Sequence, residues 1–212
     1  MALPSEKLIT INDRGARAAT TFGSLSAGGA NMVFIKKLTA SSSATLSFVD
    51  GASSVVLDDT YKEYVFTYNN IHAATDNVEF QFNVSIDGGS NYNVAKTTTY
   101  FRTYNYEDGS DAALGYRTPR DLAQGTGFQA LTEGQGNGND ESCSGQLTIF
   151  NPSDTTFVKH FIARNSMYGR TDYEMDIYVA GYANTTSAVD AVQFKMSSGN
   201  IDAGDICLYG IL

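Results

Sequence analysis

Tryptophan is absent from this sequence, and proline and cysteine are scarce, with three and two residues among 212. The cysteines, Cys143 and Cys207, are too few for a disulfide framework, and neither belongs to a Cys-x-x-Cys pair. We expect both to be unpaired and to act as small apolar residues, with a single bridge between them as the alternative. A chain of this length can bury a core without such cross-links.

Basic residues are also in short supply. Lys and Arg number 14 against 23 Asp and Glu, which gives a net charge of −9. Such a chain repels phosphate backbones, so we expect no nucleic-acid partner. No apolar run approaches the roughly 20 residues that span a bilayer, and residues 1–13 lack the apolar segment of a signal peptide. We therefore expect no membrane insertion and a product that folds in the cytoplasm but need not stay there.

Residues for catalysis are few. The only histidines are His72, in a predicted loop, and His160, on a predicted strand, and neither has the context of a nucleophile elbow. Glu133, Asp140 and Glu141 lie in a Gly-rich loop, where the carboxylates of a glycosidase would sit, but nothing fixes their separation. We expect no enzymatic activity and no catalytic residue.

Two oxygen-rich loops, Asp87–Gly89 and Asn137–Glu141, are the candidates for a hard cation such as calcium. Neither has the twelve-residue spacing with a closing bidentate glutamate. The glycines at 134, 136 and 138 have no following helix, which a phosphate-binding loop requires. We expect no metal and no cofactor, with a cation at either loop as the alternative.

The chain is rich in tyrosine and phenylalanine, with thirteen and twelve residues, which favours strands. Residues 78–86 alternate strictly between apolar and polar, which predicts a strand with one face on a core and the other toward water. Asp87-Gly88-Gly89-Ser90 then tolerates positive φ, so we expect a hairpin there.

Nine further segments read as strands, bounded by turn residues: Met32–Leu38, Thr45–Val49, Tyr61–Tyr68, Thr97–Tyr106, Gly145–Phe150, Thr156–Arg164, Asp172–Ala180, Ala191–Met196 and Asp205–Ile211. No segment has the period of an amphipathic helix. About ten short strands predict an all-β fold: an antiparallel two-sheet sandwich of the jelly-roll or Greek-key type, over residues 31–212.

Residues 1–30 differ in composition and are interpreted as an extended N-terminal arm. Gly23–Ala30 is rich in Gly, Ser and Ala and reads as a flexible connection. Leu8, Ile9 and Ile11 form a short apolar run. We expect this run to dock as an edge strand on a neighbouring subunit, with a disordered tail as the alternative.

The least regular section is Glu107–Gly145, in which Thr118–Asp121 would form one helical turn because proline suits its first position. Long ordered loops are usually functional or involved in assembly. Beside it lie the residues that we take as candidate contacts to glycan or to a second subunit: Tyr100, Arg102, Tyr104, Tyr106 and Tyr116. The alternative is that these tyrosines pack within the sheet.

Three segments share their order and spacing with one known family. The first comprises FVDG at 48–51, YKEY at 61–64, NI at 70–71 and TDN at 75–77; the second is SIDGGSNY at 85–92; the third is FKMSSGNI at 194–201 followed by Gly204 and LYGI at 208–211. Together they resemble a family of tailed-bacteriophage virion proteins that is common in marine phages. The family shows a "YxxY" strand before a "PATD"-like turn, an "S-x-DGG-x-x-Y" hairpin and a closing "SSGN-x-x-x-G-x-x-x-LYGI". Ala73 stands where the proline is usual.

The resemblance implies a non-enzymatic β-sandwich of the virion, on capsid surfaces, tail fibres or tail tips, and typically a homotrimer. A single sandwich with a short arm lacks the long shaft of a tail fibre, so we expect a trimeric capsid decoration (cement) protein bound to the major capsid protein through its arm. The alternative is a tail fibre or tail-tip module that binds a host surface glycan and contacts other tail proteins. An enzyme acting on host polysaccharide is the weakest alternative.

Overall fold

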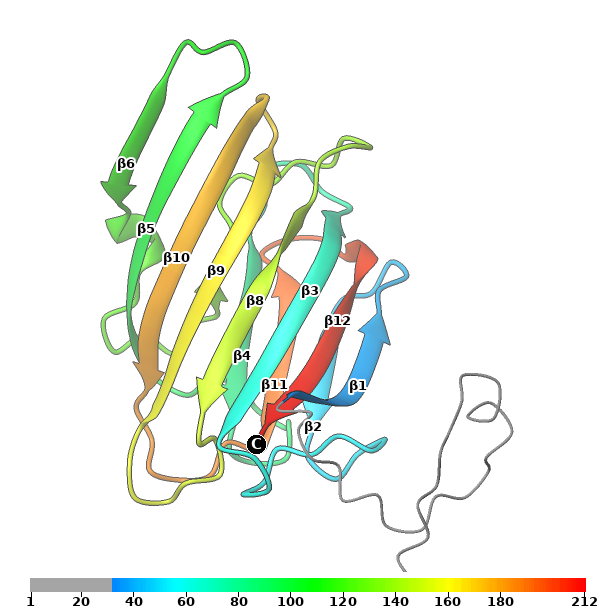
Figure 1. The fold of residues 1–212 in the computed structure, drawn as a ribbon, viewed down its shortest axis with the longest axis vertical. Coiled ribbons are helices and arrows are strands. Elements are labelled where there is room, and N and C mark those ends of the chain that lie inside the picture. Colours follow the sequence, from blue (N-terminus) through cyan, green and yellow to red (C-terminus); the bar gives the residue numbers. More distant parts are fainter. Residues whose placement is uncertain (1–31) are drawn as a thin grey trace, which may run out of the picture. The chain divides into compact units, whose positions relative to one another are not determined.

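The computed structural model describes residues 32–212, which form one compact unit (Figure 1). The arm and its predicted docking residues, Leu8, Ile9 and Ile11, lie outside the described residues. Within residues 32–212 the regular structure consists of strands and one short 3-10 helix, and all strand pairs are antiparallel.

The strands form two sheets that pack against each other, and Figure 1 shows the larger sheet in front of the smaller one. The eight-stranded sheet has the order β1 (Met32–Thr39), β12 (Ile201–Ile211), β3 (Glu63–Ala73), β8 (Cys143–Phe150), β9 (Lys159–Gly169), β10 (Tyr173–Ala183), β5 (Lys96–Tyr106) and β6 (Ala112–Tyr116). The four-stranded sheet has the order β2 (Leu46–Val49), β11 (Ala191–Met196), β4 (Phe80–Ser85) and β7 (Gln129–Ala130). The predicted all-β antiparallel sandwich is confirmed; the jelly-roll subtype stays a prediction.

The core lies between the sheets and is largely aromatic. Phe194 of β11 stacks on Phe80 of β4, with ring centroids 5.6 Å apart, and reaches Phe66 of β3 in the other sheet at 5.5 Å. Phe82 of β4 meets Phe161 of β9 edge to face at 5.1 Å. Burying each such ring stabilises the fold by about 1.5–3 kcal/mol. The apolar residues at alternate positions of the strands are therefore the ones that hold the two sheets together.

The polar face predicted for β4 does not lie toward water. Asn83 is fully buried, and its Nδ2 donates to the carbonyl oxygens of Tyr92 and Thr126 at 2.6 and 3.0 Å. Its Oδ1 accepts hydrogen bonds from the Val84 amide and from Nζ of Lys96, which is itself fully buried. Loops therefore cover this face, and the amide of Asn83 satisfies their backbone groups.

The hairpin predicted at Asp87–Ser90 is wrong, because β4 and β5 belong to different sheets and the chain crosses between them. The turn is nevertheless tight. Gly88 and Gly89 have φ of +69° and +79°, and the Asp87 carboxylate accepts hydrogen bonds from the Ser85 hydroxyl at 2.7 Å and the Asn91 amide at 2.9 Å. Hydrogen bonds from Asn91 and Ser85 lower the pKa of Asp87 to about 2.

The section from 107 to 145 holds more structure than its sequence indicated. The predicted helical turn is present as a 3-10 helix, η2 (Thr118–Arg120). The short strands β6 and β7 were not predicted, since β6 is exposed along its whole length and β7 has only two residues. The strand predicted to end at Tyr68 also runs further: β3 continues to Ala73 across a β-bulge between Tyr68 and Ile71.

The segments that carry the family resemblance meet in space although they are far apart in sequence. Tyr61 packs on Gly210 of β12, where no side chain has room, and meets Tyr64 edge to face at 5.7 Å. The Ala74 amide donates to the Asn200 carbonyl oxygen at 3.1 Å. In this chain the quoted residues therefore build the sandwich itself.

Both cysteines are unpaired. Cys143 on β8 is fully buried, which raises the pKa of its thiol well above the usual range. A thiol in such a setting stays protonated and unreactive.

Candidate functional site

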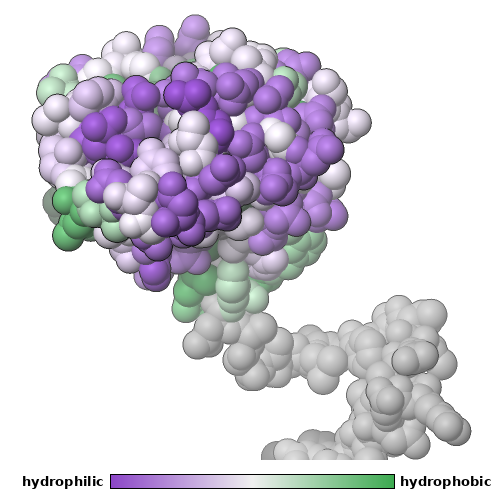
Figure 2. Space-filling view, turned by 90° about the horizontal axis from the view of Figure 1, so that it is seen from above, coloured by the Kyte–Doolittle hydropathy of each residue, from purple (hydrophilic) through white to green (hydrophobic). Residues whose placement is uncertain are grey.

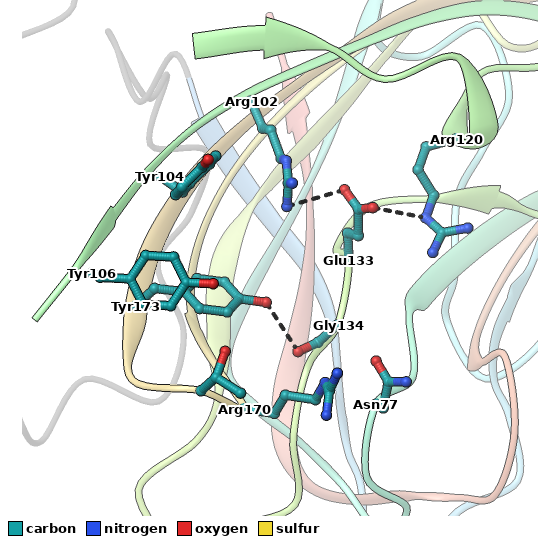
Figure 3. Close-up of a pocket in the computed structure, with 10 residues that line it drawn as sticks. Asn77, Arg102, Tyr104, Tyr106, Arg120, Glu133, Gly134, Arg170 and Tyr173 are labelled. Carbon is teal, nitrogen blue, oxygen red and sulfur yellow. Dashed lines mark hydrogen bonds and ion pairs between the residues drawn. The ribbon is translucent and has the colours of Figure 1, made fainter. Parts of the chain in front are cut away.

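A pocket of about 270 Å³ lies at the end of the sandwich where β5 finishes and β10 begins (Figure 3). It is lined by Asn77, Arg102, Tyr104, Tyr106, Arg120, Glu133, Gly134, Arg170, Thr171 and Tyr173. Figure 2 looks onto this end of the sandwich, whose surface is predominantly hydrophilic. The pocket is therefore a polar hollow in a polar end of the molecule.

Three of the side chains that line the pocket come from β5, where every second residue points to the same face of the sheet. Tyr100 faces the core and is fully buried, and Arg102, Tyr104 and Tyr106 follow at steps of two, so they share its side of the sheet. The four-stranded sheet is short, and its edge strand β7 has only two residues. The far half of β5 is instead faced by Glu133 and Gly134, which lie just after β7.

Three tyrosine rings form one wall of the pocket. Tyr106 lies between the other two, 5.9 Å from Tyr104 in an edge contact and 5.3 Å from Tyr173 of β10. The Arg102 guanidinium lies over the Tyr104 ring, 5.1 Å from its centroid. Each ring is thus held by its neighbours, which makes the wall a preformed surface.

Glu133 is buried at the head of the pocket and is surrounded by arginines. Its Oε2 lies 3.0 Å from Nε of Arg117 and 3.3 Å from Nη1 of Arg102, while its Oε1 pairs with Nη2 of Arg117 and lies 3.6 Å from Nε of Arg120. Burial alone would raise the pKa of Glu133. The hydrogen bond from Arg117 and the charges of the three arginines outweigh burial, so its pKa lies below the ordinary value. The carboxylate is therefore ionised and fully engaged.

Two buried polar atoms beside this cluster have no hydrogen-bond partner among residues 32–212: Nε of Arg120 and the hydroxyl of Tyr100. The opposite end of the Arg120 guanidinium is well paired, since its Nη2 lies 2.8 Å from Glu79. Buried polar groups without partners are uncommon and call for a specific explanation, such as a bound solvent molecule or ligand.

A second feature lies on the outer face of the large sheet. Phe101 of β5 stacks on Tyr178 of β10, with centroids 4.9 Å apart and planes 4° from parallel, and Arg164 of β9 lies over Tyr178 at 5.1 Å. Tyr116 of β6 is the strand partner of Phe101. We call these four residues the planar ladder; it crosses four neighbouring strands. Three of its members, Phe101, Arg164 and Tyr178, border a shallow apolar hollow of about 360 Å³ together with Ile162.

The structure separates the five residues predicted to contact glycan or a subunit. Arg102, Tyr104 and Tyr106 line the pocket, whereas Tyr116 is exposed on the opposite side of the sheet, in the planar ladder. Tyr100 has no exposed surface, so its side chain is not available to a glycan or to another subunit, and the alternative of packing within the sheet holds for it.

Sequence reasoning missed Arg120, Arg170, Asn77 and Tyr173 as neighbours of this group. Glu133 had been singled out only as a loop carboxylate. It does not pair with the other two acids of its loop, because Glu141 accepts a hydrogen bond from the Gly138 amide instead. The charge pattern gave no signal, because residues 107–145 hold only two arginines, Arg117 and Arg120, among seven acidic residues.

The remaining candidates for chemistry are scattered. His72 lies 2.9 Å from the Gly138 carbonyl oxygen and 3.5 Å from Asp202, and His160 packs against Tyr182. Within residues 32–212 no three His, Cys, Asp or Glu side chains are grouped so as to hold a metal ion. No helix in this part of the chain is long and apolar enough to cross a bilayer.

Fold and site together define an antiparallel β-sandwich with a preformed arginine–tyrosine pocket at one end and an exposed aromatic surface on its larger sheet. Comparison of the chain with protein-family models, with curated proteins and with solved structures finds no match.

Proposed function

We propose that this chain is a non-enzymatic virion structural protein, a trimeric capsid decoration protein that assembles through the outer face of its eight-stranded sheet. The proposal is supported by the family resemblance and by the two-sheet sandwich. The observation that carries it is the planar ladder, because contiguous exposed aromatic and aliphatic side chains mark a surface that binds another molecule.

The occupant that we assign to this face is a second copy of the chain. Phe101, Tyr116 and Ile162 are 40, 51 and 50% exposed, and the neighbouring outward positions Thr99 and Ala180 are uncharged. The one cation of the ladder, Arg164, is paired with Asp176 at 2.9 Å. Copies that each carry a net charge of −9 repel one another least when they meet through such a neutral surface.

The oligomeric state tests this proposal. The full chain at micromolar concentration should behave as a trimer in light scattering coupled to size-exclusion chromatography. Phe101→Ser should yield folded monomers, because the exposed ring contributes more to the interface than to the core. Phe157→Ser is the matched control, since Phe157 is 70% exposed but lies away from the ladder. A monomeric wild type, or a Phe101→Ser protein that remains trimeric, would contradict the proposed interface.

Copy number per particle separates decoration from a tail location. Quantitative mass spectrometry of purified virions should find hundreds of copies, and particles that lack the protein should lose their genome at lower temperature. The reason is mass action: a protein that binds only the expanded lattice stabilises it by its binding free energy. A few to a few dozen copies would place the protein on the tail.

The second candidate function is a receptor-binding module that recognises a host surface glycan, and the pocket favours it. Concave sites with aromatic walls and a few oriented polar groups are typical of small-ligand recognition. A glycan array probed with the full chain tests this candidate. Binding that Tyr106→Ala abolishes would support it, and an array without signal would remove it.

A further inference from the structure

The pocket carries a charge opposite to that of the chain. Its lining holds Arg102, Arg120 and Arg170 against the single carboxylate of Glu133, a balance of +2, whereas the whole chain carries −9. Adding Arg117 and Glu79, which pair with this group from outside the lining, leaves the balance unchanged. An acidic protein repels anions over most of its surface, so a locally positive hollow is where an anion would collect.

Arg170 has its guanidinium free. Among residues 32–212 no carboxylate lies within ion-pair distance of it. Its backbone amide donates to the Gly134 carbonyl oxygen at 3.3 Å, which fixes the turn between β9 and β10 against the pocket. In Figure 3 the side chain lies on the Asn77 side of the pocket, away from Glu133 and its arginines. The cation at this rim thus has no internal partner.

The deep side of the pocket carries a second guanidinium group, that of Arg120, whose side chain is 31% exposed. Nε of Arg120 is buried and without a hydrogen-bond partner, and it lies 3.6 Å from the nearest oxygen of Glu133. A guanidinium group presents its donors in a plane that matches the oxygens of a carboxylate or a sulfate. Guanidinium groups therefore lie on two sides of one hollow, and of these Arg170 has no ion-pair partner among residues 32–212.

The third wall is aromatic. The rings of Tyr104, Tyr106 and Tyr173 follow one another along the pocket, and such rings offer apolar faces beside polar hydroxyl groups. Tyr173 also directs its hydroxyl to the Gly134 carbonyl oxygen at 3.4 Å. The volume of about 270 Å³ lies just below the range of about 300–1,000 Å³ typical of sites for drug-sized ligands. It suits one ring with its substituents.

We propose that this pocket binds a single acidic sugar residue, one that carries a carboxylate or a sulfate ester. Arg170 holds the acid group, the charge of Arg120 attracts it from the other side of the hollow, and the sugar ring packs against Tyr106 and Tyr173. The inference rests on the second candidate function, glycan binding, and specifies its ligand class.

Calorimetric titration of the full chain tests the proposal with five probes: glucuronic acid, N-acetylneuraminic acid, glucose 6-sulfate, glucose and inorganic sulfate. The acidic sugars should bind and glucose should not, and added salt should weaken binding. Arg170→Gln should lower the affinity for the acidic sugars by at least about tenfold, which is the loss expected when one charge-assisted pair is removed. Lys62→Gln removes the same charge from an exposed position just before β3 and should leave affinity within about twofold.

Each of the other possible results would contradict a different part of the proposal. Glucose binding as tightly as glucuronic acid would refute the acidic specificity and leave glycan binding intact. Inorganic sulfate binding as tightly as the acidic sugars would refute the role of the sugar ring. Unchanged affinity in Arg170→Gln would place the ligand elsewhere. Absence of binding by every probe, with a glycan array that gives signal, would refute this ligand class alone; a silent array would remove glycan binding as a whole.

Discussion

The Glu133 carboxylate accepts a hydrogen bond from Nε of Arg117 at 3.0 Å and pairs with a second nitrogen of the same guanidinium. This bidentate pair joins the segment after β7 to the segment after β6. These two strands belong to different sheets. The acid thereby closes the head of the pocket and sets the positions of the arginines around it.

Glu133→Gln should destabilise the protein. The substitution leaves Arg117, Arg102 and Arg120 close together without a compensating charge, and loss of one partner of a largely buried pair costs about 2–3 kcal/mol after allowance for the partial exposure of the arginines. Urea denaturation measures the change, and Glu174→Gln on the exposed outer face is the control. A loss below about 0.5 kcal/mol, the range of ordinary surface substitutions, would show that the cluster contributes little to stability.

Lys96 should make stability rise with pH between about 7 and 9. Burial lowers the pKa of this lysine to about 7, so at these pH values the unfolded state binds more protons than the folded state, and the free energy of unfolding increases with pH. The expected gain is about 1–3 kcal/mol across this window.

The control for this pH dependence is Lys96→Met, which should flatten the rise and raise stability at pH 7. Chemical denaturation at pH 7, 8 and 9 measures both proteins. The window stops short of pH 10 because the buried tyrosines Tyr68 and Tyr100 have pKa values raised by burial, and they reverse the slope once free tyrosine ionises. Identical slopes for the two proteins would exclude Lys96 as the cause.

Gly210→Ala should destabilise the sandwich by about 1–3 kcal/mol, the usual cost of overpacking. The added methyl group would overlap the near edge of the Tyr61 ring, which cannot move without leaving Tyr64. Gly115→Ala on β6 is the matched control, because nothing lies within 4 Å of the new atom. Equal melting temperatures for the two variants would contradict the close approach of Tyr61 to β12.

Deletion of residues 1–30 should leave the sandwich folded and abolish attachment to particles. The expectation of folding follows from residues 31–212 forming a compact unit of their own. Circular dichroism checks the fold, and co-sedimentation with purified particles checks attachment. A truncated protein that decorates particles at the wild-type level would refute the proposal that the arm docks on capsid subunits.

Much of the fold could be predicted because apolar and polar residues that alternate along a strand indicate which of its faces is buried. The strand around Phe80 was found from its period, and the strands around Phe194 and Tyr100 were found as segments bounded by turn residues; in each the large rings are buried. The polar face of β4 was misjudged because the loops that cover Asn83 come from Tyr92 and Thr126, and no local pattern shows which loop folds over which strand.

The pocket could be predicted only in part for a similar reason. Arg102, Tyr104 and Tyr106 share a strand, so their common face follows from their spacing. Glu133 and Arg170 reach the same hollow from a loop and a turn, and only the packing of the two sheets brings them there. The turn at Asp87 was recognised from its glycines, but turn chemistry alone does not say whether the next strand joins the same sheet.

The eight-stranded sheet cannot be completed until β12, the last strand of the chain, has been synthesised. β3 ends at residue 73, yet one of its two neighbours, β12, begins at residue 201, and among residues 32–212 β12 is also the only strand that pairs with β1. At about 5–20 residues per second, a ribosome needs roughly 6–25 s to make the intervening chain. During that interval the apolar strand β3 lacks a partner on one side, so we expect the nascent protein to depend on chaperones until its last strand emerges.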